Sequence, residues 1–385
     1  MTKIVSKFNL TNGFLPATDP LQQLSKYFIE LELMCRELPK LLTGGQLRNA
    51  IAKMSEINID RLSSELEYER AMLLLSFLGH AYVWGQLPVV DHIPKQLALS
   101  WVRVAKKLDR PPILSYASYA LHNWRRLDPT RPIELGNIVL LQNFLGGIDE
   151  EWFVLVHVDI EAKAGPAVAA ALVAQQAVIG QQPQAVAKAL RDIGVALKKI
   201  NATMERMPER CDPYIYYHRV RPYIHGWKNN PALPEGLLYE GVEDYQKKPV
   251  KFLGETGAQS SIIPSLDAAL GVYHRDDPLR VYLQEMRIYM PAAHRAFIEK
   301  LEQGPKVREF IIKNYKQFPD LREQYNECIK LITRFRDTHL HYAAQYIQKQ
   351  SQTSAANPTA VGTGGTPFMK YLSKHKEETD EGLIP

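Results

Sequence analysis

Helical periodicity dominates this chain wherever a long segment can be compared with the spacing of a helix or a strand. Alternation of β-branched and polar residues, which is typical of half-buried strands, is nearly absent. Helical patterns occupy residues 19–42, 63–85 and 94–108, and turns that contain Pro and Gly separate them. The sequence therefore predicts an all-α fold.

The pattern changes after the Pro- and Gly-containing segment 127–137, beyond which the expected helices are longer. We therefore predict a small N-terminal helical domain (1–142) packed on a larger helical domain (143–385). Residues 248–265 are rich in Gly, Ser and Thr but flanked by hydrophobics, which is typical of an ordered functional loop. Residues 350–367 are of low complexity and precede a short helical pattern at 368–378, so we expect a mobile loop that acts as a lid.

Composition excludes several classes of protein. The 47 Lys and Arg residues against 42 Asp and Glu are scattered along the chain, so nucleic acid is not an expected partner. Cys35, Cys211 and Cys328 form no CxxC pair, which argues against a disulfide framework or a structural zinc site and favours a reducing compartment. No secretory leader is apparent, and Gln175 and Gln176 interrupt the apolar stretch 164–180. We expect a cytoplasmic protein with no membrane contact.

The last long helical pattern places a histidine on its apolar face. Its stripe continues to His339, whereas His341 lies about 200° around the axis, so the two cannot share one metal. A histidine at such a position is more often a satisfied core residue than a ligand. Arg336, one turn earlier, needs a carboxylate partner or an anionic ligand if it is buried. A haem would meet both needs, because its iron takes an imidazole and its propionates accept hydrogen bonds from arginine. The stripe consists of Leu321, Tyr325, Cys328, Ile332 and Phe335 and continues through His339 to Ala343.

Other cofactor motifs are weak or missing. His157 and Glu161 form an i, i+4 pair that could hold a metal on one helix face, but the Glu-x-x-His repeats of di-iron bundles do not occur. Neither HExxH nor CxxCH is present. The "GTGGT" at 362–366 follows no strand and precedes no GK[ST], so it does not predict a nucleotide site.

Several ordered motifs are spread over most of the chain. They include "AYVWG" (81–85), "LDRPPILSYASYALHNW" (108–124), "HGWKNNPAL" (225–233), "GAQSS" (257–261), "MPAAHRAFI" (290–298), the helix of His339 and "GTGGT". These motifs resemble those of the indoleamine 2,3-dioxygenases, haem enzymes that open the pyrrole ring of L-tryptophan with O2. The resemblance implies a small helical domain over a larger one that holds haem b.

The same resemblance implies roles for individual residues. His339 corresponds to the proximal ligand of the haem iron, and Arg336 with Asp267 to the polar pair that braces the haem. Arg221 corresponds to the arginine that holds the substrate carboxylate, although an ion pair at the surface or between domains is the alternative for this residue. The remaining implied positions are Tyr116, Phe153 and His157 in the distal pocket, Gly257 in the loop over the haem edge, and Thr363 in the segment that folds over the substrate.

The chain departs from the vertebrate enzymes in this pocket. His157 replaces a serine, as in the related tryptophan 2,3-dioxygenases, and could accept the hydrogen bond of the indole N–H. Glu255 replaces a glycine of the loop. Tyr216 and Tyr217 replace a phenylalanine pair, and Tyr119 replaces a smaller residue at the pocket base. These tyrosines and Glu255 predict a more polar and narrower pocket, although core packing is the commoner role for tyrosine.

The expected function is that of a haem-dependent dioxygenase that inserts O2 across the indole C2–C3 bond of L-tryptophan to give N-formylkynurenine. It needs an electron donor that keeps the haem ferrous, and the family pattern implies no obligatory acid or base residue. Two alternatives stay open: a haem enzyme of the same fold that acts on another indole derivative, and a non-catalytic helical protein that binds haem or an indole. The resemblance favours a monomer.

Overall fold

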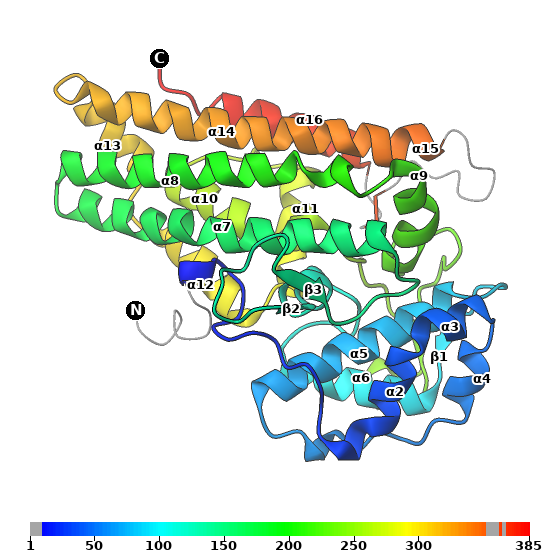
Figure 1. Cartoon of the computed structure of the whole chain (residues 1–385). Coiled ribbons are helices and arrows are strands. Elements are labelled where there is room, and N and C mark those ends of the chain that lie inside the picture. The colour runs from blue at the N-terminus through cyan, green and yellow to red at the C-terminus, as the bar shows by residue number, and fades with distance from the viewer. Residues whose placement is uncertain (1–9, 352–361, 364–366) are drawn as a thin grey trace.

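The computed structural model describes residues 10–351, 362–363 and 367–385, and nearly all regular structure in these ranges is helical (Figure 1). The all-α prediction is confirmed. The first helices are α2 (Ile29–Arg36), α3 (Leu38–Thr43), α4 (Leu47–Ala52), α5 (Glu65–Trp84) and α6 (Lys95–Lys107). The later helices are α7 (Ile148–Ile179), α8 (Pro183–Met204), α9 (Pro213–Ile215), α10 (Ile262–Leu270), α11 (Pro278–Met286), α12 (Ala292–Gln303), α13 (Val307–Asn314), α14 (Pro319–Ala343), α15 (Lys349–Ser351) and α16 (Phe368–Asp380).

The strands of the described residues form two short pairs. β1 (His92–Ile93) runs parallel to β4 (Leu238–Tyr239), with His92 opposite Leu238. β2 (Trp124–Arg126) runs antiparallel to β3 (Ile138–Leu140), with Trp124 opposite Leu140. The β1–β4 pair joins the early helices to a segment that follows α9.

The helices fall into two groups, which Figure 1 shows as an upper and a lower layer. In the upper group, α7, α8 and α14 run side by side and α16 packs on α14. The lower group holds α2 to α6 around one hydrophobic core. That core also takes Ile224, Trp227 and Leu253 from the later chain, whereas a second core lies among α7, α8, α10 and α14. The division into domains at residue 142 stays a prediction.

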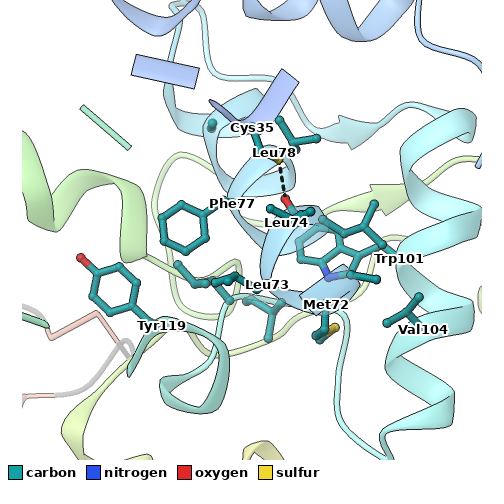
Figure 2. Close-up of a cluster of buried hydrophobic side chains, with 14 of the residues drawn as sticks. Cys35, Met72, Leu73, Leu74, Phe77, Leu78, Trp101, Val104 and Tyr119 are labelled. Carbon is teal, nitrogen blue, oxygen red and sulfur yellow. Dashed lines mark hydrogen bonds between the residues drawn. The ribbon is translucent and has the colours of Figure 1, made fainter. Parts of the chain in front are cut away.

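α5 is the central helix of the lower core. Ser64 caps it: its hydroxyl accepts from the N–H of Glu67, whose side chain accepts from the N–H of Ser64. From Ala71 to Val83 every residue of the helix is buried and nearly all are apolar, so the helix depends on its place in the core. Figure 2 shows Leu73, Leu74 and Phe77 of α5 in this core, together with Trp101 of α6.

The close contact of α5 with α6 leads to a testable prediction. A Cβ at Gly79 would lie 2.1 Å from the ring of Trp101, which is fully buried and donates to Ser76 Oγ. We therefore expect Gly79→Ala to destabilise the fold by about 1–3 kcal/mol, because the ring has no space to move into. Gly194→Ala in α8 is the control, since the nearest atom would be 4.0 Å away. It should stabilise by about 0.5–1 kcal/mol. Urea unfolding of both variants measures the difference, and equal stabilities would contradict the packing argument.

The structure differs from the predicted bounds of the helices in two places. The pattern over 19–42 predicts one helix, but α2 begins only at Ile29 and a break at Glu37 separates it from α3. Pro39 lies in the first turn of α3, where its missing N–H costs nothing, whereas in a continuous helix it would remove a hydrogen bond. The predicted loop 248–265 is ordered, as expected, but its end forms the first turn of α10.

α7 is, by length and composition, the one helix of the described ranges that could cross a membrane. Its most apolar window is 56% buried inside the protein, and the helix packs along α8 and α10. The core helix of a globular protein meets the same criterion, so this is weak evidence for a membrane span. The burial agrees with the interpretation of residues 164–180 as a packed helix.

Candidate functional site

A cavity of about 760 Å³ lies among α7, α10, α14, α16 and the loop that precedes α10. This volume is in the range of sites that bind cofactors and small molecules. Ile160, Ile262 and Phe335 give it apolar walls. Histidine side chains reach it from α7, α14 and α16: they are His157, His339 and His375.

His339 lies where the helical stripe predicts. Leu321 and Ile332 are fully buried, and the stripe then reaches the cavity, which Phe335 and His339 line. His341 is exposed on the opposite face of α14. Burial, and to a lesser extent the nearby His157, lower the pKa of His339 to about 4. Its ring is therefore neutral at physiological pH, which is the form that ligates a metal.

His157 faces the same cavity from α7. Its Nδ1 lies 2.7 Å from the carbonyl oxygen of Phe153 on the preceding turn. Burial lowers the pKa of His157, so the ring is neutral and Nδ1 carries the proton that this hydrogen bond requires. Nε2 is left with a lone pair, so it can accept a hydrogen bond from a bound molecule.

A buried ion pair lies at the His339 side of the cavity. Arg336 Nη2 donates to Asp267 Oδ2 at 2.6 Å, and both residues are about 5% exposed. Burial alone would raise the pKa of Asp267, but the charge of Arg336 and the hydrogen bond from His274 outweigh it and lower the pKa to about 2. Arg336 also donates to the carbonyl oxygen of His375, whose own Nε2 is buried without a hydrogen-bond partner in the described part of the chain. Arg336 and His375 thus suit an anionic group of a cavity ligand.

His274 joins this pair to α16. Its Nε2 is 3.1 Å from Asp267 Oδ2 and its Nδ1 is 2.7 Å from Glu378 Oε2. Burial disfavours the charged ring, but the hydrogen bond and charge of Asp267, with a contribution from Glu378, raise the pKa of His274 above its usual value.

This geometry predicts a stability effect that depends on pH. Since the folded pKa of His274 is raised, its stabilisation is complete below about pH 6.5 and is lost as pH rises through the folded pKa. We expect His274→Gln to cost about 1.5–3 kcal/mol at pH 6 and clearly less at pH 9. Urea unfolding at the two pH values measures this cost. His341→Gln on the exposed face of α14 is the control, and a cost of His274→Gln that is equal at both pH values would contradict the prediction.

The loop before α10 closes one side of the cavity with Glu255, Thr256 and Gly257. A Cβ at Gly257 would meet no atom within 4 Å, so this glycine faces open space. Thr363 packs on the loop, because its hydroxyl donates to the carbonyl oxygen of Glu255 at 2.6 Å. The carbonyl oxygen of Thr363 accepts from the N–H of Gly226 at 3.4 Å. The rest of the predicted lid lies largely outside the described residues.

Aromatic side chains complete the wall beside His157. The ring centroid of Phe153 is 4.8 Å from that of His157 and 4.7 Å from that of Tyr216. The ring centroid of Tyr116 is 5.9 Å from that of His157. Gln259 holds Tyr116 in place by accepting from its backbone N–H at 2.9 Å.

Three predicted residues lie behind this wall and do not line the cavity: Tyr119, Tyr217 and Arg221. Tyr119 is fully buried, with its ring 6.3 Å from Phe153. Arg221 is also fully buried, and its guanidinium carbon is 5.3 Å from the Tyr217 ring. The charge of Arg221 also acts on Tyr216, which does line the cavity, so Arg221 is in the layer immediately behind it.

Three π-helical turns adjoin the cavity. They begin directly after Tyr116, at Tyr216 and two residues before Tyr346, all three of which are lining residues. Single π-helical turns within helices often occur at functional sites because they change the direction of a side chain. The turns span Ala117–Leu121, Tyr216–Val220 and Ala344–Gln348.

His274 and His375 were not among the predicted site residues. His375 had a detectable signal, because Phe368, Tyr371 and His375 recur at helical spacing in the expected helix 368–378 and all three line the cavity. His274 had none, since it lies in an irregular segment and its partners are distant in sequence.

Comparison with known proteins defines the class. The family model for indoleamine 2,3-dioxygenase matches residues 5–382. Indoleamine 2,3-dioxygenase 1 of Rattus norvegicus is 39% identical over 95% of this chain and 92% of its own length. Indoleamine 2,3-dioxygenase 2 of Homo sapiens is 32% identical over 97% of this chain and 93% of its own length. The 6-hydroxytryptophan 2,3-dioxygenase of Fusarium equiseti is 30% identical over 97% of this chain and 96% of its own length.

The chain therefore belongs to the indoleamine 2,3-dioxygenase family. It is a haem-dependent oxidoreductase whose activity is that of an indole dioxygenase. The residues fit this cofactor: His339 offers a neutral imidazole, and Arg336 with His375 offers donors for its carboxylates. Within the described ranges no cluster of three or more His, Cys, Asp or Glu could hold a bare metal ion.

Proposed function

We propose that this protein inserts both atoms of O2 across the C2–C3 bond of the indole of L-tryptophan to give N-formylkynurenine. The observation that carries the proposal is one cavity that holds two neutral histidines, His339 and His157, beside the buried Arg336–Asp267 pair. His339 would ligate the iron, Arg336 and His375 would bind the propionates, and Gly257 would lie at the haem edge. When bound, the haem supplies the redox chemistry that activates O2.

The chain's own residues would position the indole. We assign to His157 Nε2 the hydrogen bond from the indole N–H, because Nδ1 is already committed to the Phe153 carbonyl. Phe153, Tyr116 and Tyr216 would enclose the ring and exclude water. Arg221 would bind the substrate carboxylate, which requires its guanidinium to turn toward the cavity from behind Tyr216 and Tyr217. Thr363 would fold over the substrate. An electron donor that keeps the iron ferrous, a monomeric state and a cytoplasmic location belong to the same proposal.

The decisive experiment combines spectroscopy with product analysis. Purified haem-loaded protein is reduced, mixed with L-tryptophan under labelled O2, and its product is examined by mass spectrometry. We expect N-formylkynurenine with both added oxygen atoms labelled. A protein that holds haem but consumes no O2 with any indole would instead be a binding protein.

A second candidate is dioxygenation of another indole. It is favoured by the polar wall that Tyr116, Tyr216 and Glu255 give the cavity. One family relative is named for 6-hydroxytryptophan, which carries an additional hydroxyl. Comparison of kcat/KM for L-tryptophan and ring-hydroxylated tryptophans separates the two candidates.

The role of His157 gives a prediction of its own. His157→Ser removes the acceptor at Nε2, so we expect the KM for L-tryptophan to rise about tenfold, the value of one hydrogen bond of about 1.4 kcal/mol. Haem content should not change, because His157 does not ligate the iron in this proposal. 1-Methyltryptophan, which lacks the indole N–H, is the matched control substrate, and its KM should not rise. Equal effects on both substrates would contradict the assigned hydrogen bond.

A further inference from the structure

Glu255 is a carboxylic acid in the cavity wall whose carboxyl group has no partner among the residues that the structure describes. It is 4% exposed and lines the cavity. Within the described part of the chain its carboxyl group makes no hydrogen bond or ion pair, and burial is the one cause that acts on its pKa. An ionised carboxylate that is buried without a partner is costly in free energy. The group is therefore stable either when it is protonated or when a cation binds beside it.

Two other buried carboxylic acids nearby each accept at least one hydrogen bond. Glu161 accepts from Ser260 Oγ at 2.7 Å, and Glu150 accepts from three backbone N–H groups, those of Phe144, Leu145 and Gly146. Neither of the two lines the cavity. Glu255 therefore differs from them both in lacking donors and in facing the site.

The backbone holds Glu255 in this position. Its N–H donates to the carbonyl oxygen of Ile224 at 3.1 Å, and its carbonyl oxygen accepts from Thr363 Oγ1 at 2.6 Å. The adjacent Gly254 is in contact with another backbone segment, because a Cβ there would lie 2.4 Å from Gly226 N. These contacts fix the backbone of Glu255 at the cavity wall.

The ionisable groups around the carboxyl are hydroxyls. Burial raises the pKa values of Tyr116, Tyr119 and Tyr216, and the charge of Glu255 contributes in each case. Burial raises the pKa of Glu255 itself to about 8, with no cation that opposes the shift. Without a cation beside it, the carboxyl group of Glu255 is therefore mostly protonated at neutral pH, and a cation bound there would favour its ionised form.

We propose that the carboxylate of Glu255 binds the ammonium group of the substrate and so makes this site select indoles that carry an amino group. The inference rests on the proposed function, because the cation is the amino group of an amino-acid or amine substrate. Arg221 would take the carboxylate of the same molecule, so the two residues would recognise opposite charges.

The test measures binding without turnover. The haem-loaded ferrous protein is saturated with carbon monoxide, which blocks O2, and three ligands are titrated by visible absorption: L-tryptophan, tryptamine and indole-3-propionate. The third ligand lacks the amino group. Glu255→Gln should raise the Kd of the two amino ligands about tenfold or more and leave that of indole-3-propionate within about twofold. Glu327→Gln is the control, since it changes a half-exposed carboxyl that pairs with Lys198 outside the cavity, and should leave all three within about twofold.

A second readout uses the wild-type protein alone. Calorimetry at pH 7 in buffers of different ionisation enthalpy should show proton release on binding of L-tryptophan, and none with indole-3-propionate. A Glu255→Gln variant that binds L-tryptophan like the wild type, or weakens all three ligands equally, would overturn the proposal, as would the absence of proton release. The proposed function fails separately, if the wild type forms no N-formylkynurenine.

Discussion

His339→Ala should yield a protein that folds but retains almost no haem. The ring lies at the cavity wall and not within the packed core, so its loss should change the free energy of unfolding by about 1 kcal/mol or less. Loss of the ligand itself should weaken haem binding by more than about 100-fold, since even changes beside a metal ligand cost 10- to 100-fold. The Soret absorbance per protein chain measures retained haem, and urea unfolding measures the fold.

Two controls make this result specific. His341→Ala removes an exposed histidine two residues away on the same helix and should leave the haem content unchanged. Added imidazole should restore part of the Soret absorbance of His339→Ala, because the space left by the side chain opens to the cavity. Full haem retention by His339→Ala would overturn the assignment of the ligand and with it the proposed site.

The position of His339 could be predicted because helical periodicity is a local property. Its stripe runs through four buried residues of one helix, and 3.6 residues per turn carry the pattern directly to His339. α6 was predictable for the same reason. α5 has no single apolar face, but the Ser64–Glu67 cap marks its start in the sequence itself.

Contacts between distant segments could not be predicted from such patterns. Thr363 and Glu255 meet across 108 residues, and His274 and Glu378 across 104. No spacing rule connects these positions, because tertiary packing alone brings them together. Arg221 shows a further limit: the family resemblance assigns it to the substrate, but this structure buries it one layer behind the cavity.

Asp267→Ala should be among the most destabilising single changes in the protein. It would leave the guanidinium of Arg336 buried without its carboxylate and remove an acceptor from His274. Breaking one partner of a buried ion pair costs about 3–5 kcal/mol, because the remaining charge is uncompensated. Urea unfolding at pH 6 measures this cost. Glu327→Ala, which breaks the half-exposed ion pair with Lys198, is the control and should cost less than about 1 kcal/mol.

The double variant Asp267→Ala/Arg336→Ala separates the charge from the packing. If the uncompensated guanidinium of Arg336 causes the loss of stability, the double variant should lose clearly less free energy of unfolding than the two single variants lose together. The pKa of Asp267 is depressed to about 2 from a usual value of 3.8, so its stabilisation is present above about pH 4 and is lost as pH falls toward 2. The gap between wild type and Asp267→Ala should therefore stay constant from pH 5 to 6 and narrow at pH 3. A gap of the same size at pH 3 would mean that lost packing, and not the Arg336 charge, accounts for the effect.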